Sequence, residues 1–269
     1  YETLVSAATT AENILAGGDE DAIAAAIVPM KQALDSYYKG LMIESNELTD
    51  RVVNPHFDRN GVNEGWSGNP TVRDHVAEIF NSGFNISQTV KGLEDGYYLV
   101  YFQGYYRNGN HPDSNARHAD GSEQLLARFS LNDMDKPVVS LMGEVHDGYW
   151  WGAPNTMAEA HAVFSQSAGH YANYLIARAV DGELTISLNK SKLCDADWFC
   201  FDNVRLFRVE TSYTAIEEID ADAVTGFSSD AVVYDLQGRL MGGYAGLRHL
   251  SPGVYVVAEG GRSLKVVKK

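Results

Sequence analysis

Basic residues are scarce in this sequence of 269 residues. Lys and Arg total 21 against 36 Asp and Glu, which gives a net charge of -15 at pH 7 with neutral histidines. No basic run is longer than the two lysines that end the C-terminal Val-Val-Lys-Lys. Because nucleic acids and anionic lipids attract basic surfaces and repel acidic ones, we expect neither as a partner.

Long hydrophobic runs are also missing. Hydrophobic residues make up 45% of the chain and charged residues 21%, as in ordinary globular proteins. The apolar stretches fall well short of the roughly 20 residues that a membrane-spanning helix needs, so we expect no transmembrane segment. Helical material begins directly at Tyr1, without a signal peptide. We expect that a leader has been removed or that the chain is a piece of a longer protein.

The chain has only two cysteines, Cys194 and Cys200, which flank an acidic turn. In an exported protein this spacing allows a small-loop disulfide. Two free cysteines on a buried strand edge would give the same pattern. Both interpretations stay open from the sequence.

Helical periodicity marks residues 1–48 and predicts a helical hairpin, either complete or the end of a longer helical domain. The apolar stripe of the second helix consists of Ile23, Ile27, Met30, Leu34, Tyr37 and Leu41. Pro29 lies inside this helix, where it removes a backbone hydrogen bond, so we expect a bend there. Two helices bury too little surface alone, so the hairpin must pack on the next domain or on further helices.

In residues 49–211 the sequence has the periodicity of β-strands instead of that of helices. The second half of the segment Trp198–Val209 alternates, with Val204 and Leu206 on one face, and we expect it to be the last strand of a β-sandwich. Short strands separated by glycine-bearing turns, with one brief helix, predict a mainly β fold of the jelly-roll type.

Two connections of this sandwich carry further predictions. Residues 105–123 are rich in Gly, Asn, Asp, His and Ser and form the longest candidate loop, a feature that is often functional. Residues 170–180 and 183–188 flank Asp181-Gly182, a strong turn signal, so we expect these two segments to pair as a hairpin.

The end of the chain separates from the sandwich by composition. Residues 212–227 are acidic and rich in threonine, which predicts a linker. Residues 228–269 contain two pairs of short apolar segments and predict a small antiparallel β domain.

Six motifs follow one another across residues 51–209. They are Val53-Asn-Pro-His-Phe-Asp58, Gly65-Trp66, Gly96-Tyr-Tyr-Leu-Val100, Gly104-Tyr-Tyr-Arg107, Gly182-Glu-Leu-Thr-Ile186 and Phe201-Asp-Asn-Val-Arg-Leu206. In this order they resemble the galactose-binding-like, carbohydrate-binding-module-type jelly rolls attached to exported proteins of polysaccharide-degrading gut bacteria. The resemblance implies the fold more specifically than it implies a ligand.

The tail resembles a second family. Val233-Tyr-Asp-Leu-Gln-Gly-Arg239, then Leu250-Ser-Pro-Gly-Val-Tyr-Val256 and the terminal lysines, are similar to the C-terminal sorting-type domain of secreted proteins from the same bacteria. This resemblance implies secretion machinery as a partner. The expected location is secreted or on the outer cell surface.

Asp58 and Asp202 are the candidate metal ligands. In the resembling modules, an acid after the first strand and another at the start of the last strand together hold a structural calcium. Calcium takes six to eight hard oxygen ligands, and an irregular loop such as residues 58–70 offers backbone carbonyls freely. The alternative is that Asp202 caps a turn through hydrogen bonds to the backbone.

The candidate ligand-binding residues combine aromatic rings with a planar donor, as sugar recognition requires. They are Tyr105, Tyr106, Arg107, Tyr149, Trp150 and Trp151. The alternative is that these rings fill the sandwich, with at least one of Trp150 and Trp151 in the core; we assign Trp66 and Trp198 wholly to the core. Burying two aromatic faces contributes roughly 3–6 kcal/mol while association costs at least about 4, so binding would be in the high micromolar to millimolar range.

The expected function is therefore an exported, non-catalytic protein that binds glycans weakly. One alternative is a structural or adhesive surface protein whose jelly roll is a spacer, and a second is a polysaccharide-active enzyme. The sequence has no nucleophile elbow, zinc-protease helix or phosphate loop. A polar set that could form a metal or acid-base cluster, or simply a solvated loop, consists of His111, Asp113, His118, Asp120, His146 and Asp147.

Overall fold

The chain forms two compact units, residues 1–210 and residues 211–269. The computed structural model describes residues 2–17, 20–209, 227–235, 240–250, 253–259 and 262–268. The linker expected at 212–227 lies outside the described residues, apart from its last position.

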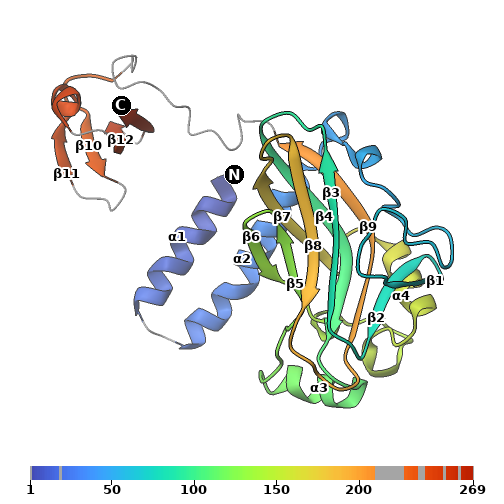
Figure 1. Cartoon of the computed structure of the whole chain (residues 1–269). Helices are drawn as coiled ribbons and strands as arrows, with labels where there is room; N and C mark the ends of the chain where they lie inside the picture. The colour runs from blue at the N-terminus through green and yellow to red at the C-terminus, as the bar shows by residue number, and fades with distance from the viewer. Residues whose placement is uncertain are drawn as a thin grey trace. The chain divides into compact units, whose positions relative to one another are not determined.

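Two antiparallel sheets form a β-sandwich in the larger unit (Figure 1). In spatial order, the five-stranded sheet contains β1 (Thr71–Arg73), β2 (Val76–Phe80), β9 (Trp198–Val209), β4 (Tyr97–Arg107) and β7 (Ala172–Arg178). The four-stranded sheet contains β3 (Phe84–Lys91), β8 (Glu183–Lys190), β5 (Arg128–Leu131) and β6 (Met134–Pro137). The prediction of a mainly β sandwich is confirmed. The last strand of the sandwich is β9, which pairs with β2 on one side and β4 on the other.

Strand β4 is buried on both faces. Every residue after Tyr97 is buried, because one face packs on the four-stranded sheet and helices cover the other. On the first face, Phe102 meets Phe129 of β5 edge-on at 4.9 Å between ring centroids. On the second, Tyr101 shares an apolar cluster with Leu41 at the end of α2. A strand in this position is buried on both sides, which accounts for the aromatic and aliphatic residues on both of its faces.

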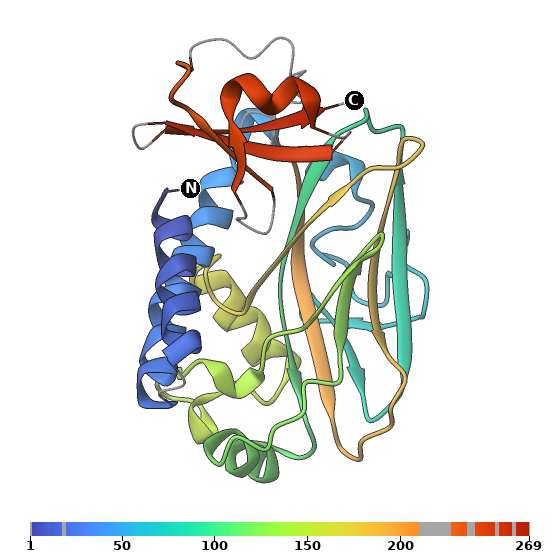
Figure 2. The ribbon, with the colours of Figure 1, turned by 90° about the vertical axis from the view of Figure 1, so that its left-hand side faces the viewer.

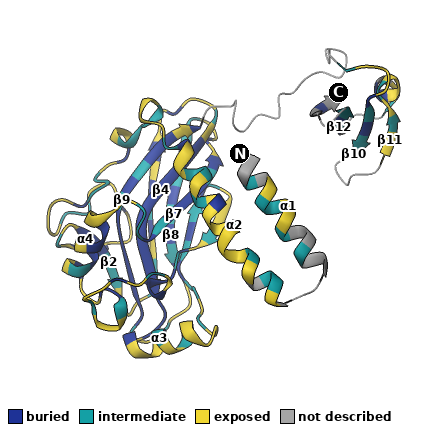
Figure 3. Cartoon of the chain, turned by 180° about the vertical axis from the view of Figure 1, so that it is seen from behind, coloured by how far each residue is buried: buried dark blue, intermediate teal, exposed yellow. Residues whose placement is uncertain are grey.

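Helices α1 (Glu2–Gly17) and α2 (Glu20–Leu41) form the predicted helical hairpin, which Figure 2 shows as two neighbouring helices. The ring of Tyr38 stacks on Tyr174 of β7 at 4.9 Å, and the Tyr174 hydroxyl donates to Asp35 at 3.2 Å. The sandwich therefore covers the end of α2, while much of this helix stays exposed (Figure 3). Helix α2 continues through Pro29. Among the described helices, none is long and apolar enough to cross a membrane.

The expected loop at residues 105–123 is wrong. Strand β4 extends to Arg107, and helix α3 (His111–Ala119) follows after a short turn. The Asn110 side chain caps this helix by accepting a hydrogen bond from the Asp113 amide at 2.9 Å, and a proline in the first turn suits it. The polar composition of the segment therefore comes from an exposed capped helix.

Shorter helical segments lie between the strands. They are η1 (Glu44–Asn46), η2 (Thr49–Arg51), η3 (Leu141–Gly143), η4 (Trp150–Gly152) and helix α4 (Met157–Gln166). Helix α4 buries Met157, Ala160, Val163 and Phe164 beneath the five-stranded sheet, next to β2 and β9.

The hairpin expected across Asp181-Gly182 is wrong as well. Both residues have the positive φ angles of a tight turn, 52° and 75°, so the turn itself forms. However, β7 pairs with β4, whereas β8 pairs with β3 and β5 in the opposite sheet. The turn carries the chain from one sheet to the other.

The smaller unit is the predicted antiparallel β domain. Its strands, in spatial order, are β11 (Leu240–Gly243), β10 (Val232–Asp235), β12 (Gly253–Glu259) and β13 (Arg262–Lys268), with the 3-10 helix η5 (Tyr244–His249). Val233, Leu247, Val257 and Val266 are buried in its core.

Candidate functional site

Tyr105, Tyr106 and Arg107 lie in the interior, so their expected role as exposed binding residues is wrong. The two tyrosine side chains are fully buried and Arg107 is 5% exposed. Tyr105 packs edge-on against Trp198 at 5.1 Å, and the Tyr106 hydroxyl donates to Asp197 Oδ2 at 2.8 Å. The polar composition of residues 105–123 predicts a loop here, but Tyr105 and Tyr106 continue the aromatic pattern of β4, and this continuity is the signal in the sequence that points to a strand.

Arg107 links three loops. Its Nε donates to Gly109 O at 2.9 Å, Nη1 to Asn155 Oδ1 at 2.5 Å and Nη2 to Ala196 O at 3.2 Å. Its guanidinium also lies over the Trp198 ring, 5.4 Å from the centroid. Arg107 therefore positions this end of the sandwich.

Trp150 and Trp151 are both exposed, at 61% and 48%, so the alternative that one of them enters the core is wrong. Their ring centroids lie 6.0 Å apart on η4. Tyr149 is half-buried and packs against the cluster under α4. Trp66 and Trp198 are buried, as predicted. We call the exposed pair the Trp150–Trp151 platform.

The platform is held rigidly from below. Trp150 stacks on the buried His111 of α3 at 5.5 Å and 15°. Burial, and then the charge of Arg107, lowers the pKa of His111, so its ring is neutral at pH 7 and stacks as an apolar surface. Trp151 has a φ of 57°, a left-handed conformation that is costly for a bulky residue. Two neighbouring indoles are therefore exposed to solvent above a buried ring and a strained turn.

A second concave feature lies beside Arg107. A cavity of about 360 Å³ is lined by Arg73, Glu78, Phe80, Arg107, Asn155, Thr156, Met157 and Trp198. Phe80 is 56% exposed, and Glu78 accepts a hydrogen bond from Trp198 Nε1 at 2.7 Å. An exposed ring beside planar polar groups offers a surface that complements a polar ligand with apolar faces. Phe80, Glu78 and Asn155 were missed from the sequence because β2, β9 and the segment before α4 meet here only in the fold.

Asp202 is a buried carboxyl group with one oxygen that lacks a hydrogen-bond partner. It is 3% exposed, and its Oδ1 has no hydrogen-bond partner in the structure. Burial raises the pKa of Asp202 to about 8; the Asn203 backbone amide opposes this rise, and the charge of Asp58 adds to it. Asp58 itself is exposed and lies 3.8 Å from His75 Nδ1. The irregular segment before Asp58 has positive φ angles at Asn54 and Phe57, 50° and 47°.

The two cysteines are free, so the disulfide alternative is wrong. Cys200 is fully buried on β9, in the cluster that contains Trp198, whereas Cys194 is half-buried in the loop before that strand. Burial raises the pKa of the Cys200 thiol well above its usual value. Packing between the five-stranded sheet and α4, rather than a covalent bond, holds this residue.

The histidines and acids of the expected polar set do not form a single cluster. His111 lies under Trp150, and His118 contacts Glu123 Oε2 at 2.7 Å. His146 lies instead beside Glu144 and His170.

No family model and no curated protein matches the sequence. Solved structures similar to this chain include three carbohydrate-binding modules. A family 61 module in complex with β-1,4-galactotriose is 16% identical, with 61% of this chain and 98% of that chain covered and a TM-score of 0.30. A family 4 module is 12% identical, with coverages of 58% and 99% and a TM-score of 0.32. A family 35 module from Clostridium thermocellum is 16% identical, with coverages of 55% and 85% and a TM-score of 0.27.

Proposed function

We propose that this protein is a non-catalytic carbohydrate-binding protein and that the Trp150–Trp151 platform is its contact surface. The observation that carries the proposal is the pair of neighbouring indoles, 61% and 48% exposed, on a turn with a left-handed Trp151. Exposing two indoles to water is unfavourable, and so is the strained backbone that presents them. A ligand with apolar faces that covers both rings offsets these costs.

Sugars fit this surface because their C–H faces stack on aromatic rings while their hydroxyl groups need planar polar partners. The cavity beside Arg107 supplies such partners in Glu78 and Asn155, next to the exposed Phe80 ring. The two aromatic faces together contribute roughly 3–6 kcal/mol against an association cost of at least about 4, so an isolated site binds in the high micromolar to millimolar range. Retention on a polysaccharide then depends on several contacts along one polymer.

The test is a glycan array followed by affinity electrophoresis or calorimetry with the glycans that bind. Trp150→Ala and Trp151→Ala should each weaken binding about 10-fold or more, since each removes one stacking face. The matched control is Tyr97→Ala, which removes an exposed aromatic ring, 41% exposed, at the start of β4. Equal affinity in all three variants and the unchanged protein would contradict the proposed surface.

We propose in addition that Asp58 and Asp202 hold a structural calcium ion. The buried Asp202 Oδ1 without a partner supports this, because an isolated buried carboxylate is costly unless a cation or a proton neutralises it. Asp58 would supply a second carboxylate, and the irregular segment before it would supply carbonyl oxygens. Asp202 lies inside β9 rather than at its entrance, so the bound ion would fix this loop to the middle of β9 and would not itself contact a sugar.

The proposal includes export to the cell surface or the medium, with residues 228–269 as the part that secretion machinery recognises. Its support is the sequence of the tail, which resembles sorting-type domains. The tail also folds as a unit with its own buried core, as a separately recognised module requires.

A further inference from the structure

Three side chains with metal-binding atoms converge at the start of β7. Glu144 follows η3, His146 comes two residues later, and His170 lies in the turn before β7. His170 Nδ1 is 2.9 Å and His146 Nε2 is 3.3 Å from Glu144 Oε2. All three ligand atoms lie within 4.8 Å of one another.

We propose that Glu144, His146 and His170 form a binding site for a divalent transition-metal ion of the zinc type. Zinc takes imidazole nitrogen at about 2.0–2.1 Å and carboxylate oxygen at about 2.0–2.2 Å in a tetrahedral arrangement, which places neighbouring ligand atoms roughly 3.3 Å apart. The separation of 3.3 Å between His146 Nε2 and Glu144 Oε2 equals this edge length, and the 2.9 Å between His170 Nδ1 and Glu144 Oε2, a hydrogen bond in this structure, lies close to it. Two histidines and one glutamate also form a ligand set that zinc uses in proteins.

One buried nitrogen of the site has no hydrogen-bond partner. His146 is 8% exposed, and its Nε2 makes no hydrogen bond although it faces the Glu144 carboxylate. The backbone amide of Tyr171 donates to Glu144 Oε1 at 2.6 Å, which orients the carboxylate with Oε2 toward the two rings. Such outer hydrogen bonds commonly orient metal ligands.

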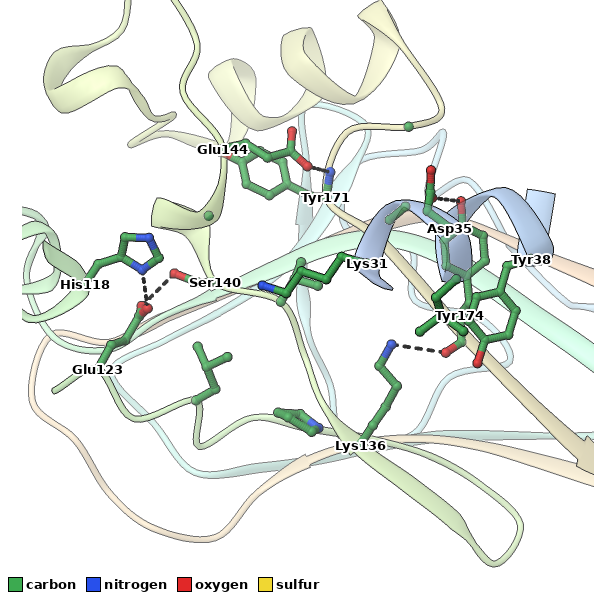
Figure 4. Close-up of a pocket in the computed structure, with 17 residues that line it drawn as sticks. Lys31, Asp35, Tyr38, His118, Glu123, Lys136, Ser140, Glu144, Tyr171 and Tyr174 are labelled. Atoms are coloured by element: carbon green, nitrogen blue, oxygen red, sulfur yellow. Dashed lines mark hydrogen bonds and ion pairs between the residues drawn. The ribbon is translucent and has the colours of Figure 1, made fainter. Parts of the chain in front are cut away.

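Glu144 also lines a cavity of about 610 Å³ between α2 and the sandwich. Figure 4 shows Glu144 and Tyr171 at one end of this cavity and Lys31 nearer its middle. Three protein ligands leave a fourth tetrahedral position, which water or an anionic group entering from the cavity would take.

This site differs chemically from the calcium site proposed at Asp58 and Asp202. Imidazole ligands favour zinc and related metals, whereas calcium takes only oxygen ligands and prefers six or more of them. The two sites can therefore be tested separately in one protein.

The experiment is titration of the metal-stripped full chain with Zn²⁺ by calorimetry and with Co²⁺ by visible absorption, in a buffer that does not chelate metals. We expect one ion per chain, with the visible bands of tetrahedral Co²⁺, and no competition from millimolar Ca²⁺. His170→Ala, His146→Ala and Glu144→Gln should each weaken Zn²⁺ binding by more than the roughly 10- to 100-fold that loss of an outer partner costs.

His118→Ala is the matched control, because His118 and Glu123 form a histidine–glutamate pair without a second histidine. This variant should bind Zn²⁺ as the unchanged protein does. Circular dichroism verifies that each variant is folded. If an alanine variant does not fold, the conservative Glu144→Gln and His170→Gln variants are used in its place. The proposal is overturned if the unchanged protein binds neither ion stoichiometrically, or if His118→Ala weakens binding as much as the ligand variants. Loss of glycan binding in Trp150→Ala leaves this test unaffected.

Discussion

Replacing Asp202 by asparagine should stabilise the protein at neutral pH when calcium is absent and destabilise it when calcium is bound. Without calcium, burial raises the folded-state pKa of Asp202 to about 8, against about 3.9 for an unfolded chain. Between these values the folded protein holds a proton that the unfolded chain releases. The free energy of unfolding of the chelated protein therefore falls as the pH rises from about 4 to about 8.

The slope of the free energy of unfolding against pH gives the size of this effect. One proton contributes about 1.4 kcal/mol per pH unit, so Asp202 alone should lower the free energy of unfolding by about 2.7 kcal/mol between pH 5 and pH 7. For a unit of this size that corresponds to roughly 5–11 °C in Tm. Asparagine is nearly isosteric and does not titrate, so Asp202→Asn should lack this decline. Calcium favours the ionised carboxylate and should abolish the decline in the unchanged protein.

The assay is thermal unfolding of both proteins at pH 5, 6 and 7, with a chelator and with calcium. We expect Asp202→Asn to be the more stable protein at pH 7 with the chelator and the less stable one with calcium. Subtracting one protein from the other removes the contributions of the remaining titrating groups. Parallel pH profiles in the chelator would refute the argument from burial, and equal stabilisation of both proteins by calcium would refute Asp202 as a ligand.

Two further predictions concern the buried ion pair and the tail. Lys190 and Asp197 form an ion pair in which both residues are at most 2% exposed, so Lys190→Met should cost about 3–5 kcal/mol in urea unfolding because it leaves a buried carboxylate. A cost below about 1 kcal/mol would contradict the argument that Lys190 is needed in this buried pair. For export, a chain that ends at residue 227 should stay inside a host that carries the sorting machinery, while the full chain reaches its surface or medium. Equal export of both would contradict a sorting role for residues 228–269.

Local pattern was a good guide to the elements and a poor guide to their partners. The turn at Asp181-Gly182 forms as predicted, yet the segments on either side enter opposite sheets, because hydrogen-bonding partners come from β4 and β3, far away in sequence. Likewise, Tyr105 and Tyr106 are of a residue type that also forms exposed sugar-binding surfaces. Their burial depends on α4 and on the Lys190–Asp197 pair covering them.

The sequence by itself determined the helical hairpin, the mainly β sandwich with Trp198–Val209 as its closing strand, and the small β domain at the end. It could do so because hydrophobic periodicity and turn residues act over a few neighbouring positions. Only the tertiary structure decided which aromatic rings face solvent, and only it brought His170 to Glu144 and His146. Exposure and ligand geometry depend on contacts between residues distant in the chain, which no local pattern records.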